Sequence, residues 1–128
     1  MTVDAVKIRF VMADVSILVD GYDSKRFTEP IKSGIGILKR GTLMAQNSSD
    51  KLWYPYDPNG SNGLNTPRGI LLSDVDTSKV TEGVLVEDGK VYGNQLIVGA
   101  VTDFDDPGTA ATRADTDLMK PLIQTVWV

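Results

Sequence analysis

The sequence predicts a small single domain of the α+β class, mostly β, with short strands, one C-terminal helix and an extended N-terminal β arm. A chain of 128 residues with 41% hydrophobic content suits one compact domain. Its 12 glycines and 6 prolines lie between short apolar runs, and a helical period is found only near the C-terminus, so strands should dominate. Because the chain has no cysteine, its fold must rest on packing rather than on disulfides.

The first strand is expected at the N-terminus, where apolar and polar residues alternate. Its apolar side consists of Val6, Ile8, Phe10 and Met12. Lys7 and Arg9 interleave on the other side, and a second short run over residues 15–19 ends at Asp20-Gly21. Two interpretations remain open here: an ordinary core hairpin, or an arm that completes a sheet on a partner.

A polar, irregular connector is expected over residues 22–34, where Pro30 and Gly34 are among the breakers. The chain is therefore divided into an N-terminal β arm and connector, residues 1–34, and a body, residues 35–128. Within the body we expect two short strands around a bend at Gly41 and a buried strand at residues 69–75. Residues 84–86 and 91–98 are expected to pair as a hairpin around Gly89.

The chain should end with one helix and one strand. Asp106 is expected to cap the helix, with Pro107 at its first position and Pro121 ending it. The residues that repeat every four positions are Ala110, Ala114 and Leu118. The tail, residues 122–128, alternates in the manner of a final strand.

A turn-rich loop over residues 46–68 carries three aromatic residues, Trp53, Tyr54 and Tyr56. They are candidates for core or interface packing, or for stacking against a carbohydrate. The run that starts at Asp57 has the first ligands of a calcium loop. However, Asn62 stands where that loop needs glycine and Arg68 where it needs glutamate, so a plain surface loop without metal is predicted.

The composition argues against catalysis. With neither histidine nor cysteine, the usual proton carrier, thiolate nucleophile and transition-metal ligands are missing. The carboxylates of residues 103–106 precede the expected helix, where its dipole favours them, and Asp115 and Asp117 diverge on the helix surface. No serine nucleophile motif or phosphate-binding loop is present. We therefore expect neither an enzyme nor a cofactor.

Charge and hydropathy narrow the partners. Residues 1–40 carry seven Lys or Arg and five Asp or Glu, whereas residues 41–128 carry six and twelve, which gives the net charge of −4. An acidic body without a basic face is not expected to bind nucleic acid. No apolar stretch approaches the roughly 18 residues that span a bilayer, and no basic leader is visible. A soluble cytoplasmic product is therefore expected.

Several segments in this order and spacing resemble the lambda-type phage head decoration family, over roughly residues 36–126. They are Leu38-Lys39-Arg40-Gly41-Thr42-Leu43, Tyr54-Pro55, Arg68-Gly69-Ile70-Leu71-Leu72-Ser73-Asp74-Val75-Asp76, and the late helix and strand. No single motif is unique to the family. The Lys-Arg-Gly-Thr entry followed by Gly-Ile-Leu and Asp-Val-Asp at this separation carries the resemblance.

The resemblance implies a mixed fold with little regular structure and a homotrimer on the local three-fold axes of the expanded head. It also implies an N-terminal arm that adds to a β-strand of the major capsid protein, and a mechanical role without catalytic residues. The protein would then be made in the host cytoplasm and would lie on the outer capsid surface of the virion. The expected capsid-binding arm residues are Val3, Val6, Ile8, Phe10 and Met12. The N-terminus is longer and more strongly β-patterned than the family pattern. The alternative function is a virion or surface carbohydrate-binding β module.

Overall fold

The computed structural model describes residues 17–19, 24–119 and 122–127. This part is mostly β with one short α-helix, which confirms the predicted α+β class. The strands are β1 (Lys25–Pro30), β2 (Ile37–Leu38), β3 (Leu43–Gln46), β4 (Trp53–Pro55), β5 (Gly69–Leu71), β6 (Val75–Asp76), β7 (Glu82–Tyr92), β8 (Ile97–Val98), β9 (Thr109–Ala110) and β10 (Ile123–Val126). The helical elements are the 3-10 turn η2 (Gly93–Gln95) and the α-helix α2 (Arg113–Asp117).

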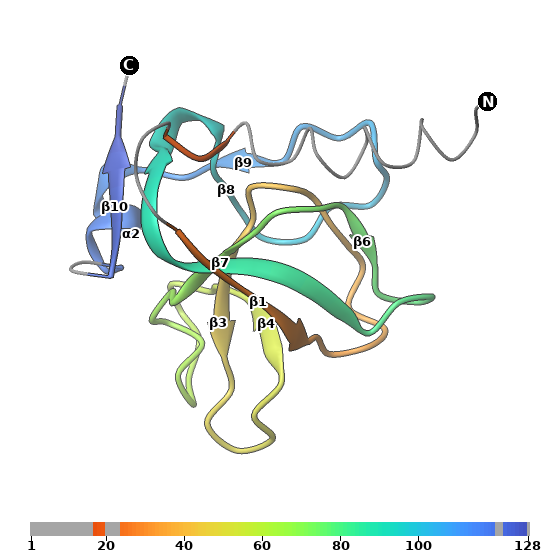
Figure 1. Cartoon of the computed structure of the whole chain (residues 1–128). Helices are drawn as coiled ribbons and strands as arrows, with labels where there is room; N and C mark the ends of the chain where they lie inside the picture. Colours follow the sequence, from red (N-terminus) through yellow and green to blue (C-terminus); the bar gives the residue numbers. More distant parts are fainter. Residues whose placement is uncertain (1–16, 20–23, 120–121, 128) are drawn as a thin grey trace.

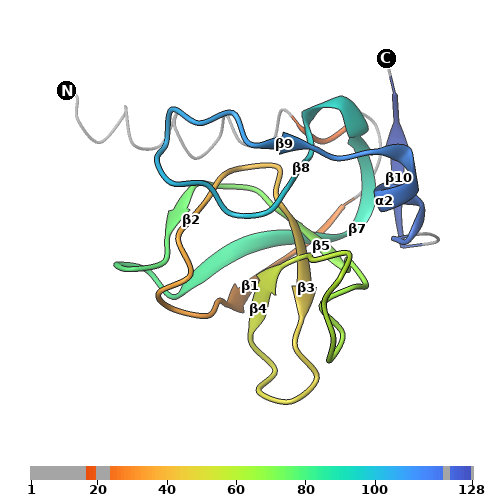
Figure 2. The ribbon, with the colours of Figure 1, turned by 180° about the vertical axis from the view of Figure 1, so that it is seen from behind.

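A six-stranded sheet organises the described part of the chain. Its strand order is β1-β7-β5-β3-β4, and β10 pairs with β7 outside this row. β7 crosses the molecule as a long curved ribbon, with α2 and β10 together at one end (Figure 1). In both views the hairpin of β3 and β4 projects from one side, and β8 and β9 lie at the opposite side (Figure 2). β7 is thus the strand to which most others attach.

Both faces of the sheet are buried at its centre, where β3, β5 and β7 lie side by side. Leu43, Ile70 and Val86 stand opposite one another on β3, β5 and β7, and their side chains belong to one hydrophobic cluster. Leu71 and Leu85, one residue along, pair with each other and belong to a second cluster. A strand covered on both sides carries a continuous apolar run rather than an alternating one. A core strand is therefore confirmed in the predicted segment of residues 69–75. It is shorter than predicted, because β5 ends at Leu71 and Val75 begins the separate strand β6.

The sheet curls until its two ends approach each other. Ile31, which follows β1, forms a parallel bridge with Trp53 of β4, and the Lys32 N–H donates to the Trp53 carbonyl oxygen at 3.1 Å. Ile31, Trp53, Leu71 and Leu85 all belong to the second cluster. The second cluster is therefore the filling of a small barrel-like curl, and the first cluster packs on its outside.

The prediction of an irregular connector over residues 22–34 is wrong, because Lys25–Pro30 forms β1. Every residue of β1 except the half-buried Glu29 is exposed, so the segment lacks the apolar alternation that would have identified a strand. Its pairing with β7 over six register positions comes from the backbone of a distant segment. An edge strand is held by main-chain hydrogen bonds to its neighbour. The amino-acid composition of the segment does not show whether such a neighbour is present.

The predicted hairpin at Gly89 is also wrong, because β7 runs without interruption from Glu82 to Tyr92. Gly89 has a positive φ of 147°, but it lies at a bend within one strand and not at a turn between two strands. Opposite β1, the register shifts from Arg26–Val86 to Lys25–Asp88, which inserts one extra residue at Glu87. Such a bulge bends a strand and re-aims its side chains. Beyond the bulge, β10 takes over as a partner of β7.

The helix is shorter than predicted and starts later. Its N-cap is Thr112, not Asp106, and Thr112 forms a reciprocal capping box with Asp115. Residues Thr109–Ala110, expected in the helix, instead form β9 and pair with β8. The Asp106 carboxylate accepts a hydrogen bond from the Gly108 N–H at 2.8 Å and so closes a turn rather than capping a helix. The final strand is confirmed as β10, which lies parallel to the second half of β7.

The turn at Gly41 joins the core strands, as predicted, and it is held tightly. Gly41 has a φ of 97°, and a Cβ atom there would lie 2.5 Å from the Gln95 carbonyl oxygen. Its N–H donates to the Leu71 carbonyl oxygen, and its own carbonyl oxygen accepts from the Ile97 N–H. The buried Thr42 hydroxyl donates to the Lys39 carbonyl oxygen at 2.6 Å. Only glycine combines this backbone conformation with this close approach.

Gly41→Ala should therefore lower the free energy of unfolding by about 3 kcal/mol, through left-handed strain plus the collision with a backbone atom. Gly34→Ala is the matched control, since Gly34 has a φ of 72° but no atom within 4 Å of an added Cβ. It should cost only about 1 kcal/mol. Urea denaturation of both variants measures the difference, and equal losses would contradict the close approach.

Candidate functional site

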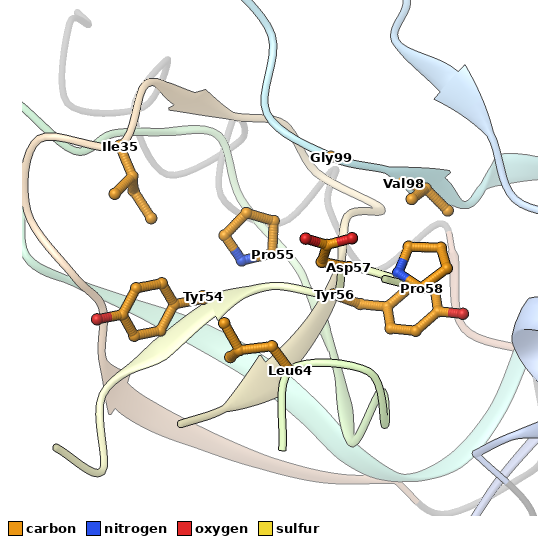
Figure 3. Close-up of a pocket in the computed structure, with 9 residues that line it drawn as sticks. All are labelled: Ile35, Tyr54, Pro55, Tyr56, Asp57, Pro58, Leu64, Val98 and Gly99. Atoms are coloured by element: carbon orange, nitrogen blue, oxygen red, sulfur yellow. The ribbon is translucent and has the colours of Figure 1, made fainter. Parts of the chain in front are cut away.

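One shallow hollow of about 370 Å³ opens on the described surface. Ile35 and the Val98–Gly99 segment border it on one side, and the chain from Tyr54 to Pro58 borders it with Leu64 on the other (Figure 3). Its lining is mainly apolar, with the Asp57 carboxylate as its one charged group. Such a surface can hold an apolar side chain, but it places no acid and base side by side for catalysis.

Two of the three candidate aromatics are core residues. Trp53 is 2% exposed and belongs to the second hydrophobic cluster, and Tyr56 is 3% exposed and belongs to the first. The Tyr56 hydroxyl donates to the Asp115 carboxylate at 3.1 Å, which links the loop to the start of α2. Burial, more than this hydrogen bond, raises the pKa of Tyr56 above its usual value. Both rings are therefore fixed by packing.

Tyr54 is the candidate aromatic with solvent-accessible surface. It is half-buried at the edge of the hollow, and its hydroxyl donates to the Asp50 carboxylate at 2.7 Å. This hydrogen bond raises the pKa of Tyr54. The Leu52 N–H and then the Tyr54 hydroxyl lower the pKa of Asp50. Stacking on a sugar needs exposed ring faces, so the burial of Trp53 and Tyr56 does not favour a carbohydrate platform.

The predicted arm residues Val3, Val6, Ile8, Phe10 and Met12 lie outside the described residues. The described chain begins with residues 17–19, which are attached to the second half of β7. Ile17 is fully buried in the first cluster, Leu18 forms an antiparallel bridge with Val91, and the Val19 N–H donates to the Lys90 carbonyl oxygen at 3.0 Å. Whatever precedes Ile17 is thus connected directly to the central strand.

A second surface feature is the outer edge of β1, which the sequence analysis missed. β1 is the terminal strand of the sheet and pairs with β7. On its other side, β4 is reached only beyond the end of β1, at Ile31 and Lys32. Lys25 and Arg26 are exposed and form no ion pair with other described residues, and the side chain of Phe27 is 49% exposed. Phe27 was the one residue in this segment whose apolar side chain could have indicated a strand, but its neighbours in the sequence are polar.

Two glutamates meet beside this strand. Glu87, at the bulge of β7, is half-buried, and its Oε2 atom has no hydrogen-bond partner among the described residues. Burial raises the pKa of Glu87 to about 8, the side chain of Glu29 on β1 adds to the rise, and Arg68 partly opposes it. With this pKa, the carboxyl group of Glu87 is protonated at neutral pH.

Arg40 and Asp74, which lie in the segments of the family resemblance, and the adjacent Thr77 have structural roles. The Asp74 carboxylate accepts a hydrogen bond from the Arg40 N–H at 2.8 Å. The buried Thr77 hydroxyl accepts from the Ile35 N–H at 2.9 Å and donates to the Gly36 carbonyl oxygen at 2.6 Å. These bonds satisfy main-chain groups where β2, β3 and β6 meet. The motif thus specifies the scaffold rather than a binding site.

The chain belongs to the bacteriophage lambda head decoration protein D family, whose model matches residues 18–117. This is a family of structural phage proteins and not of enzymes. Membership implies a decoration role on the phage capsid and a place on the virion. No curated protein matches the sequence closely enough to be compared.

Metal ligands and membrane-spanning helices were looked for in the described part of the chain. Among the described residues, no group of three acidic side chains is placed to hold a metal ion. Within the same part of the chain, no helix has the length and apolar character to cross a membrane.

The protonated Glu87 predicts a pH dependence of stability. The folded state holds its proton up to about pH 8, whereas the unfolded chain releases it near the ordinary value of 4.5. The folded state thus binds more protons in this window, and the free energy of unfolding should fall as the pH rises from about 4.5 to 8. Glu87→Gln removes this fall, so the variant should gain stability over the wild type at pH 8 and much less at pH 5.

Thermal unfolding at several pH values measures this gain. Glu82→Gln, an exposed substitution on the same strand, is the matched control and should leave the pH profile unchanged. Parallel profiles for Glu87→Gln and the wild type would show that Glu87 titrates normally.

Proposed function

We propose that this protein is a capsid cement protein, which binds the outside of a phage head as a homotrimer and stabilises it against the pressure of the packaged DNA. The observation that carries the proposal is the family match over residues 18–117. The partner is the major capsid protein, contacted by an arm that contains Val3, Val6, Ile8, Phe10 and Met12. The protein is made in the host cytoplasm and acts on the outer surface of the virion, without binding nucleic acid.

The attachment of residues 17–19 suggests how load passes from the arm to the body. Ile17 is buried in the first hydrophobic cluster, and the main chain at Leu18 and Val19 is bonded along β7. A pull on the arm therefore acts along a paired strand and against a packed core, not on a loose loop. β7 in turn is bonded to β1, β5 and β10, which distributes the load over the sheet.

The trimer adds avidity to this attachment. Three arms on one trimer make weak strand contacts act together, since binding of the first arm raises the effective concentration of the others. Main-chain hydrogen bonds to an exposed capsid strand satisfy donors and acceptors on both partners. The functional division into an arm with connector, residues 1–34, and a body, residues 35–128, stays a prediction.

The purified protein should be a trimer in solution. Multi-angle light scattering should give a mass about three times that of the 13.9 kDa chain. Exposed apolar side chains such as Leu118 and Leu122, each about half exposed, are the type of surface that a subunit contact would cover. A monomer both in solution and in chemically crosslinked decorated heads would contradict the trimer.

Deletion of residues 1–14 should abolish binding to undecorated expanded heads while the body stays folded. The main-chain pairing to the capsid is then lost, whereas Ile17 and its contacts remain. Phe10→Asp should weaken binding by removing apolar burial worth about 2 kcal/mol per arm. Lys7→Ala, on the other side of the expected strand, is the matched control and should have little effect. Cosedimentation with heads measures binding, and circular dichroism verifies folding.

Wild-type binding by the folded deletion variant would exclude the arm as the clamp. Loss of folding in that variant would instead assign the N-terminal strands to the core hairpin that the sequence leaves open.

A further inference from the structure

The hydrogen-bonding phase of β1 shows which of its main-chain groups face outward. The Ile31 N–H donates to the Thr81 carbonyl oxygen at 2.8 Å, which marks Ile31 and Thr81 as a hydrogen-bonded pair. Such pairs alternate along an antiparallel ladder, so Glu29 and Phe27 also bond to β7, whereas Thr28 and Arg26 do not. The N–H and C=O groups of Thr28 and Arg26 therefore point away from the sheet.

The other side of the ladder confirms this phase. Val84 stands opposite Thr28, and its carbonyl oxygen accepts from the Leu72 N–H at 2.9 Å, on the side of β5. Val84 therefore does not bond to β1, as the alternation requires. Pro30, which has no N–H, ends the strand and shortens the usable edge.

The side chains along this edge define what can lie against it. Phe27 offers a half-exposed aromatic ring, and Lys25 and Arg26 offer two positive charges with no ion-pair partner among the described residues. The protein as a whole has a net charge of −4. The positive charge of β1 is confined to its first two residues, because Glu29 follows on the same strand and Asp88 of β7 stands opposite Lys25. Lysine on an edge strand commonly prevents unwanted pairing with other strands. A partner strand with acidic residues can still pair, because its charges attract those of the lysine.

The edge is continuous with the proposed arm. Leu18 and Lys25 are both paired antiparallel to β7, at Val91 and Asp88 respectively. Residues 17–19 and β1 therefore follow each other along β7. A contact at β1 and a contact made through residues 17–19 would act on the same central strand.

We propose that the outer edge of β1 is a second docking site for the capsid, which accepts an extended segment of the major capsid protein as an added strand. The segment carries an acidic residue for Lys25 and Arg26 and an apolar residue for Phe27. This inference rests on the proposed function, because it names the capsid protein as the partner. It adds a contact made by the folded body to the one made by the arm.

The arm of a second copy fits this edge less well. Residues 3–12 contain Lys7 and Arg9 but a single acidic residue, Asp4. Pairing them with β1 would bring positive charges beside Lys25 and Arg26. An acidic segment from another protein avoids this repulsion.

Thr28→Pro tests the outward hydrogen bond. The substitution removes an N–H that makes no bond within the sheet, so β1 stays paired with β7. Binding to undecorated expanded heads should weaken about tenfold or more, as each of several subunits loses one interstrand bond. Thr28→Ala keeps the N–H and is the matched control, with wild-type binding expected. Circular dichroism verifies that both variants are folded.

Charge reversal tests the proposed partner chemistry. The double variant Lys25→Glu with Arg26→Glu should weaken binding to heads and reverse its dependence on salt, because attraction becomes repulsion. Lys79→Glu changes an exposed lysine in the turn before β7 and should bind as the wild type does. Equal binding by the double variant and the control would show that the partner segment is not recognised through acidic residues.

A crosslink identifies the occupant without relying on folding of the proline variant. The chain has no cysteine, so Thr28→Cys carries a single photoreactive maleimide on the exposed edge. On decorated heads, the product should have the summed mass of this chain and the capsid subunit. A product between two copies of this chain, or no product on saturated heads, would overturn the inference.

The outcomes separate the two proposals. If the wild type does not bind heads, both fail. If the wild type binds in an arm-dependent manner but Thr28→Pro binds as tightly as Thr28→Ala, the arm clamp stands and the second docking site is excluded.

Discussion

The pairing of β7 on both sides is the interaction on which the remaining structure depends. Its first half is bonded to β1 and β5, and its second half is bonded to β10 and bridged to Leu18. The change of partners occurs at the bulge at Glu87 and is completed at Gly89, where the positive φ allows the strand to bend. One strand therefore holds the N-terminal segment, the sheet and the C-terminal strand together.

Burial on both faces of the sheet explains why so little regular structure is sufficient. The first cluster is closed by Ile17, Tyr56 and Met119 from three separate segments, and the second is filled by Trp53 and Leu85. Such irregular segments leave main-chain groups that a ladder would otherwise satisfy. Side chains provide the hydrogen bonds at these positions. The Asp74 carboxylate accepts from the Arg40 N–H, and the Thr77 hydroxyl accepts from the Ile35 N–H and donates to the Gly36 carbonyl oxygen. Asp74 and Thr77 thus meet a structural requirement of a fold with short strands.

In our proposal the function depends on strand edges and not on a pocket. The aromatic loop contributes Trp53 and Tyr56 to the core, and the hollow beside Tyr54 has no pair of groups for acid-base chemistry. By contrast, β1 is a terminal strand of the sheet, and we propose that this strand and the arm both pair with the capsid protein. Strand contacts are individually weak, but a decorated lattice would repeat them many times.

The sequence by itself determined the fold class, a buried strand that begins at Gly69, the turn at Gly41 and the final strand, because each has a local pattern. The lack of histidine and cysteine also removed the side chains most often used for acid-base and thiolate catalysis. Only the tertiary structure decided that Lys25–Pro30 is a strand, that Gly89 bends β7 instead of reversing it, and that Thr112 begins the helix. It also raised the pKa of Glu87, because burial beside Glu29 unites residues far apart in the chain. Sequence periodicity shows which face of one segment can be buried. The pairing of an edge strand and the approach of two carboxyl groups depend instead on which distant segment lies beside it in the folded chain.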